Sequence, residues 1–149
     1  MNATAEISTN DTAPARSHAA LRWMSLIVGY ACVAIGLAHL VLGEAAVPDM
    51  GTAAATPDSQ SRFFGAIFVG YGLAWIWSVR GPIIDTRAVR WLAGIFLLGA
   101  VGRFISMAVH GWPHPFILVL TALEVLIPPL FIWLAVLEQR RVATTPIGR

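Results

Sequence analysis

The sequence has little charge and no lysine. Charged residues make up 12% of its 149 residues and hydrophobic residues 57%, whereas soluble proteins are about 25% charged and about 45–50% apolar. This balance excludes an ordinary soluble domain and is typical of a chain that lies in a lipid bilayer. The ten basic residues are all arginine and stand in short groups between apolar runs. We interpret them as membrane-topology signals and expect no nucleic-acid partner.

Cysteine is almost absent too, because Cys32 stands alone within an apolar run. No intramolecular disulfide is possible, and there is no pair of thiols for disulfide exchange. The composition therefore argues against a quinone-linked thiol oxidoreductase. The histidines near Glu124 do not have the spacing of metal ligands, so we expect neither a metal nor another cofactor.

Four apolar runs approach the roughly 20 residues needed to cross a bilayer. They cover residues 23–42, 63–79, 91–109 and 116–137. The second run is the shortest and is diluted by glycine. A cleaved signal peptide is the alternative for the first run, but its apolar core would be about 7–15 residues. Because the connections are short, consecutive helices must be antiparallel neighbours, and we predict an all-α integral membrane protein with an up-down four-helix bundle.

Polar segments separate and flank these runs. We predict a disordered tail over residues 1–20, a transmembrane domain over 21–139 and a second tail over 140–149. The prolines and acidic residues of 43–61 predict a loop, and 80–90 and 111–115 are further connections. Pro128 and Pro129 should kink the last helix. We find no internal repeat, so an inverted-repeat transporter is unsupported.

The arginines predict the orientation of the bundle. One side would carry eight of them: Arg16, Arg22, Arg80, Arg87, Arg90, Arg140, Arg141 and Arg149. The other side would carry only Arg62, so the positive-inside rule places both termini in the cytoplasm. Five tryptophans near the same side fit an interfacial belt: Trp23, Trp75, Trp77, Trp91 and Trp133. We expect the protein in the cell membrane, and the arginine-rich, lysine-free composition hints at a bacterial source.

Two ionisable residues fall inside the predicted membrane, Arg103 and Glu124. Such a residue costs about 2.5–3.5 kcal/mol on insertion scales, so a partner is required. Both lie roughly 10–13 Å below the outer end of their helices at 1.5 Å per residue. Since these helices are adjacent and antiparallel, we predict an ion pair between Arg103 and Glu124.

Further polar and small residues follow helical spacing. Glycines on the first helix form a stripe with Cys32 and His39, and small residues let helices in lipid approach closely. Asp58 lies one turn before Arg62 and should pair with it. We predict one outward-facing polar pocket, lined by His39, Arg62, Arg103, Ser106, His110 and Glu124, with Asp58 at its edge. Structural roles for these residues, in packing or in helix register, remain the alternative.

The chain resembles the family known as domain of unknown function 4345. The resemblance rests on Asp58, Arg62-Phe63, Gly65 and Gly70-Tyr71-Gly72, on Phe96-Leu97-Leu98-Gly99, Gly102-Arg103 and Ser106, and on Gly111, Pro113, Pro115, Ala122-Leu123-Glu124 and Pro128. It covers roughly residues 23–137. It implies a four-helix membrane protein with Arg62, Arg103 and Glu124 as characteristic polar positions, and it brings no established activity. The layout also broadly resembles the DoxX-like membrane proteins, which says little about function.

Three functions fit these features. The first is a non-enzymatic component, either lipid-binding or an accessory subunit beside another membrane protein or a second copy. The second is binding or transport of a small anionic or lipid ligand, with proton exchange at Glu124 or His39. The third is a membrane-embedded enzyme using Ser106, His110 and Glu124. We favour the first and lean against an enzyme, because the third constellation lies largely on one helix.

Overall fold

The computed structural model describes residues 12–47 and 54–144, which form four α-helices and one short 3₁₀ turn. The elements are α1 (Thr12–Leu42), η1 (Gly43–Ala46), α2 (Ala55–Ser78), α3 (Thr86–His110) and α4 (Pro115–Thr144). The all-α prediction with four helices is confirmed. Of these helices, α1, α3 and α4 are long and apolar enough to cross a membrane. In α2, the glycines and Arg62 lower the hydropathy, so its membrane span stays a prediction.

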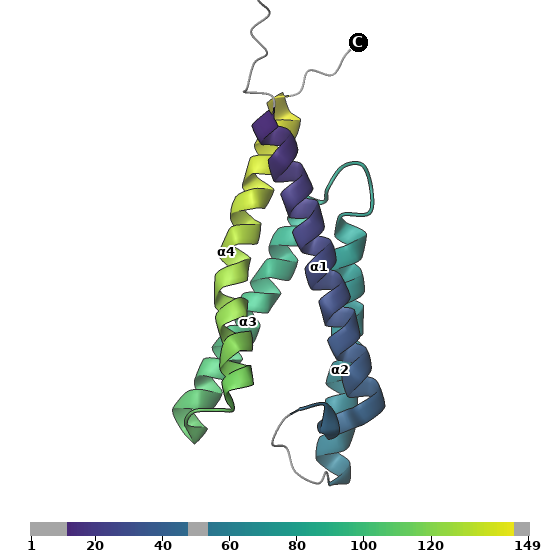
Figure 1. The fold of residues 1–149 in the computed structure, drawn as a ribbon, viewed down its shortest axis with the longest axis vertical. Helices are drawn as coiled ribbons and strands as arrows, with labels where there is room; N and C mark the ends of the chain where they lie inside the picture. Colours follow the sequence, from purple (N-terminus) through teal and green to yellow (C-terminus); the bar gives the residue numbers. More distant parts are fainter. Residues whose placement is uncertain (1–11, 48–53, 145–149) are drawn as a thin grey trace, which may run out of the picture.

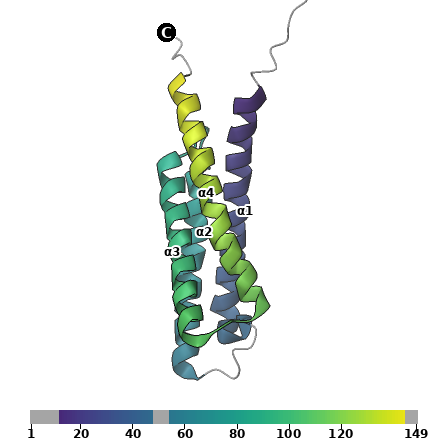
Figure 2. The ribbon, with the colours of Figure 1, turned by 90° about the vertical axis from the view of Figure 1, so that its left-hand side faces the viewer.

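The helices form two antiparallel hairpins, α1 with α2 and α3 with α4. Figure 1 shows the hairpins meeting at the end that holds the start of α1 and the end of α4, and diverging toward the opposite end. Figure 2 shows all four helices running along the same long axis. The connection between α2 and α3 lies toward the end where α1 begins and α4 ends, whereas the turn between α3 and α4 lies at the opposite end. We call the end where the hairpins meet the closed end, and the opposite end the open end.

Glycines bring α1 and α2 into backbone contact. A Cβ atom added at Gly36 would lie 2.7 Å from the carbonyl oxygen of Gly65, and one at Gly72 would lie 2.5 Å from that of Gly29. These distances are too short for any side chain, so the two helices pack through their bare backbones. Gly29 and Gly36 are seven residues apart on α1, and Gly65 and Gly72 are seven residues apart on α2, so the glycines lie on one face of each helix. The predicted small-residue stripe therefore builds the first hairpin.

The buried core lies toward the closed end, where all four helices contribute. It consists of Leu21, Trp75, Val79, Ile84, Val89, Leu92, Ala93, Phe131, Leu134 and Ala135. Trp75 is fully buried and its ring lies 4.5 Å from that of Phe131. The prediction that Trp75 belongs to an interfacial belt is wrong, because it faces the other hairpin. Trp23, Trp77, Trp91 and Trp133 are exposed.

Several predicted boundaries are wrong. Residues 12–20 and 140–144, expected in the tails, are helical, so α1 and α4 extend beyond the predicted bilayer. The loop expected over 43–61 ends early, because α2 begins at Ala55 and Pro57 lies in its first turn, where the missing N–H would have no helical partner anyway. In α3, Asp85 caps the N-terminus by accepting from the N–H groups of Arg87 and Ala88. The remaining predictions for 1–11, 48–53 and 145–149 lie outside the described residues.

The remaining surface of the helices is mostly apolar. Only 17–28% of the residues in the most apolar windows of α1, α3 and α4 are buried within the chain. Leu98, Val109 and Leu126 are each more than two thirds exposed. Apolar exposure on this scale marks a membrane or protein contact surface. The α4 helix continues through Pro128 and Pro129, and the kink expected there stays a prediction.

Candidate functional site

A cleft of about 670 Å³ opens between the two hairpins toward the open end. The first half of α2, the second half of α3, and α4 with its preceding turn each contribute a wall. Its lining residues are Phe64, Phe68, Gly99, Gly102, Arg103, Ser106, Met107, Pro113, Ile117 and Glu124. Most of this lining is apolar, and the two charged residues in it are the pair predicted from the sequence.

The ion pair between Arg103 and Glu124 is confirmed. The Nε of Arg103 donates to one carboxylate oxygen at 2.7 Å, and its Nη2 donates to the other at 2.9 Å. The two parallel bonds form the bidentate geometry that makes such pairs strong and directional. The side chain of Glu124 is 12% exposed and that of Arg103 is 31% exposed. The pair therefore links α3 to α4 and also forms part of the cleft wall.

One nitrogen of Arg103 is not used in this pair. The two N–H groups of Nη1 have no acceptor in the described part of the chain, while Nε and Nη2 are both bound to Glu124. A guanidinium carries five N–H donors, and an unpaired donor away from water raises the free energy. The cleft therefore combines a neutralised ion pair with unused hydrogen-bond donors.

Aromatic side chains connect the lining of the cleft to the core. The ring of Phe68 stacks on Tyr71 at 6.0 Å, and Tyr71 stacks on Phe96 of α3 at 6.2 Å. The hydroxyl of Tyr71 donates to the carbonyl of Leu92 and so joins α2 to α3. Tyr71 also contacts Trp75 in the core. Phe68 of the cleft lining is thus linked through Tyr71 to Trp75 in the core.

A second polar site lies at the end of α1, apart from the cleft. Arg62 donates through Nε to Asp58 at 2.8 Å and through Nη1 to the carbonyls of Leu40 and Val41 at 2.6 and 3.0 Å. Those carbonyls are in the last turn of α1, where helical donors are missing. Gly43, with φ +61°, leaves the space that Asp58 occupies.

Asp58 and Arg62 precede the predicted second span. The hydrogen bond from the Arg62 guanidinium holds the pKa of the Asp58 carboxyl below its usual value. Asp58 therefore stays ionised and paired under mildly acidic conditions. Two hydrogen bonds of Arg62 stay within α2, where Asp58 accepts them, and two cross to the carbonyls at the end of α1. The site is therefore a clamp within the first hairpin.

The structure brings only half of the six residues of the predicted pocket into the cleft. Arg103, Ser106 and Glu124 line the cleft, whereas Arg62, His39 and His110 do not. His39 donates through Nδ1 to the carbonyl of Ile35 in its own helix. The prediction placed two sites in one pocket because it used only the depth of each polar residue along its own helix. That depth does not reveal that the hairpins diverge.

A third polar cluster, which was not predicted from the sequence, lies near the closed end. Glu138 is fully buried, and its carboxylate accepts from Nδ1 of His18 at 2.7 Å and from Nη2 of Arg141 at 2.7 Å. The cluster joins the start of α1 to the end of α4. The i, i+3 spacing of Glu138 and Arg141 is a signal that could have found half of it. The contact with His18 spans 120 residues and falls in a segment that was predicted to be disordered.

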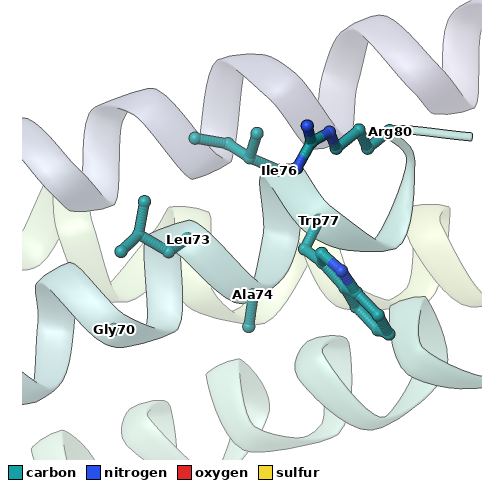
Figure 3. A pocket seen from close by; sticks show the side chains of 6 residues that line it. All are labelled: Gly70, Leu73, Ala74, Ile76, Trp77 and Arg80. Carbon is teal, nitrogen blue, oxygen red and sulfur yellow. The ribbon is translucent and has the colours of Figure 1, made fainter.

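A shallow groove of about 530 Å³ lies along α2, and Figure 3 shows its lining residues. They all belong to α2 and the residues just after it: Gly70, Leu73, Ala74, Ile76, Trp77 and Arg80. Arg80 is the only charged residue in this lining, and no other helix contributes to it. Within residues 12–47 and 54–144, no three His, Cys, Asp or Glu residues are grouped as metal ligands would be. The cleft is therefore the stronger candidate site.

Comparison with known protein families identifies the region of the chain that contains the cleft residues. The family model described as Domain of unknown function (DUF4345) matches residues 20–135. This region contains Arg62, Arg103 and Glu124 but ends before Glu138. No curated protein and no solved structure matches the chain. Since the match covers most of the sequence, the chain belongs to the DUF4345 family.

Proposed function

We propose that this protein is a non-enzymatic membrane component that binds a lipid-like amphiphile in the cleft between its hairpins. The observation that supports the proposal is the combination within the cleft lining: apolar walls from three helices surround a guanidinium with unused donors. An amphiphile has both parts that such a site requires, a hydrocarbon body and a polar group. Pockets that orient a ligand are generally apolar with a few placed polar groups.

The surroundings of the cleft support a membrane ligand. The apolar outer faces of α1, α3 and α4 suit a bilayer, and the hairpins diverge toward the end where the cleft opens. An acyl chain could then enter sideways from the bilayer without crossing water. Phe64, which is 61% exposed, would stand at this entrance.

The other functions have less support. A proton-linked transporter would attract an anion with Arg62 and Arg103 and exchange a proton at Glu124 or His39, but Arg62 and His39 do not line the cleft. An enzyme would use Ser106 and His110, and no hydrogen bond joins these two residues in the described chain, where His110 is exposed at the end of α3. A role as an accessory subunit, with a purely structural ion pair, is the main competitor and predicts that the cleft stays empty of lipid.

A steric block of the cleft tests the proposal. The protein would be placed in vesicles containing a phosphatidylcholine with a photoreactive diazirine on one acyl chain, and labelled peptides would be mapped by mass spectrometry. We expect labelling around Phe68 and Met107 in the wild type. Gly102→Leu should reduce this labelling by at least about fivefold, because Gly102 lines the cleft and has open space beside it.

Gly94→Leu is the matched control, since Gly94 lies on the same helix with open space beside it but does not line the cleft. It should leave the labelling unchanged. Equal labelling in the wild type and both variants would show that the lipid only surrounds the protein, and the proposal would be wrong.

A further inference from the structure

We infer that the cleft selects an uncharged lipid that presents a carbonyl oxygen to Arg103, an inference that rests on the proposed function. Esters, ketones and other neutral carbonyl lipids share this chemistry. Anionic lipids would be disfavoured, although an arginine in a cleft would ordinarily suggest an anion.

The charge of Arg103 is already balanced. Both oxygens of Glu124 accept from the guanidinium at 2.7 and 2.9 Å, so the pair has no net charge. An anionic head group would bring the cleft to a net charge of −1 and place a second negative group near Glu124. Among apolar walls this charge is poorly screened, and the head group would lose its hydration without gaining a cation of its own.

The unused donors of Arg103 call for a neutral acceptor instead. Nη1 has two N–H groups without an acceptor in the described residues, on a side chain that lines the cleft. A carbonyl oxygen has two lone pairs and carries no charge, so it can accept from Nη1 without disturbing the ion pair. The walls formed by Phe64, Phe68 and Ile117 then contact the hydrocarbon body.

Three competitors of nearly equal size test whether the cleft recognises a neutral carbonyl, a carboxylate or the hydrocarbon alone. Methyl oleate offers a neutral carbonyl, oleate offers a carboxylate, and a heptadecene offers no acceptor. Each would compete with the photoreactive phosphatidylcholine for the wild-type protein, at a pH that fully ionises oleate. We expect methyl oleate to compete at a concentration about tenfold lower than either of the others, the ratio typical of one hydrogen bond to a charged donor.

The outcomes separate this inference from the proposed function. If oleate competes as well as methyl oleate or better, the inference is overturned while lipid binding stands. If the heptadecene competes equally, the carbonyl is not recognised and the inference also fails. If no competitor reduces labelling and Gly102→Leu has no effect, both proposals fail together.

Glu124→Gln provides an independent arm. The substitution keeps the size of the side chain and releases the charge of Arg103, so oleate should gain at least about tenfold relative to methyl oleate. Asp58→Asn is the matched control, because it removes a negative charge from an arginine pair outside the cleft. It should retain the wild-type preference. An unchanged preference in a folded Glu124→Gln protein would overturn the inference, and the wild-type comparison decides alone if that variant does not fold.

Discussion

Arg103 lies in an apolar helix and therefore requires a partner of opposite charge. Its partner, Glu124, comes from the neighbouring helix, and the bidentate bonds fix the rotation of α3 against α4. Gly99 lies beside this pair, where an added Cβ atom would lie 3.8 Å from the Glu124 carboxylate. An added Cβ atom would therefore be in ordinary van der Waals contact with the carboxylate, so this position has room for a small side chain beside the pair.

The first prediction concerns this pair. Arg103→Met and Glu124→Gln should each lower the free energy of unfolding by about 2–4 kcal/mol, less than for a fully buried pair because Arg103 is partly exposed. The double variant should regain most of that loss, since no unpaired charge remains. Unfolding of the detergent-purified variants by a denaturing detergent measures these differences.

The double variant also separates stability from binding. It should be folded and yet lose the advantage of methyl oleate over the heptadecene, because no donor remains at residue 103. A double variant that keeps this advantage would show that recognition of the carbonyl does not require Arg103.

At the scale of the elements, the two hairpins are built by different interactions. Backbone contact at glycines joins α1 to α2, and the Arg62 clamp holds the end of α1. The α3 and α4 helices are joined by the ion pair across the cleft and by the tight connection of 111–114, where Gly111 has φ +84°. The first hairpin is therefore fixed along its length, whereas the second is held by an ion pair at one level and by the tight connection at its end.

The second prediction compares two glycines of α2 that lie two residues apart. Gly72→Ala should lower the free energy of unfolding by about 1–3 kcal/mol, the range typical of overpacking, because its Cβ would overlap the backbone of Gly29. Gly70→Ala should be neutral or stabilising by up to about 1 kcal/mol, since nothing lies within 4 Å of its Cβ. The same unfolding measurement checks both, and equal effects would contradict the close packing of α1 against α2.

At the scale of the whole molecule, the closed end holds the hairpins together. Trp75 and Phe131 bring α2 and α4 into contact in the core, and the cluster of His18, Glu138 and Arg141 joins α1 to α4 nearby. The cleft lies beyond these contacts. It therefore lies between the hairpins in the part of the molecule where they diverge.

The third prediction concerns orientation in the membrane. In a Cys32→Ala background, Trp112→Cys should react with an impermeant maleimide on intact cells, because Trp112 is 85% exposed in the α3–α4 turn, on the predicted outer side. Ile83→Cys, in the α2–α3 connection where Ile83 is 69% exposed, should react only after the cells are opened. The reverse pattern would place the termini outside, with the cleft opening toward the cytoplasm.

The sequence by itself determined the class of the protein and its central pair. Apolar runs of near-spanning length predict the helices, and a lone arginine and a lone glutamate at matching depth require each other, because neither is stable alone in an apolar medium. Asp58 and Arg62 follow from helical spacing in the same way. These features depend on local periodicity and on the cost of charge, which are both readable along the chain.

The tertiary structure alone decided how the polar residues divide among sites. Whether His39 and Arg62 share a pocket with Glu124 depends on the angle between two hairpins, and that angle follows from packing at the closed end. Trp75 is buried, not interfacial, and Glu138 is paired with His18, because residues distant in sequence meet there. Contacts of this kind arise from the shapes of opposing helix faces, which no single helix carries in its own sequence.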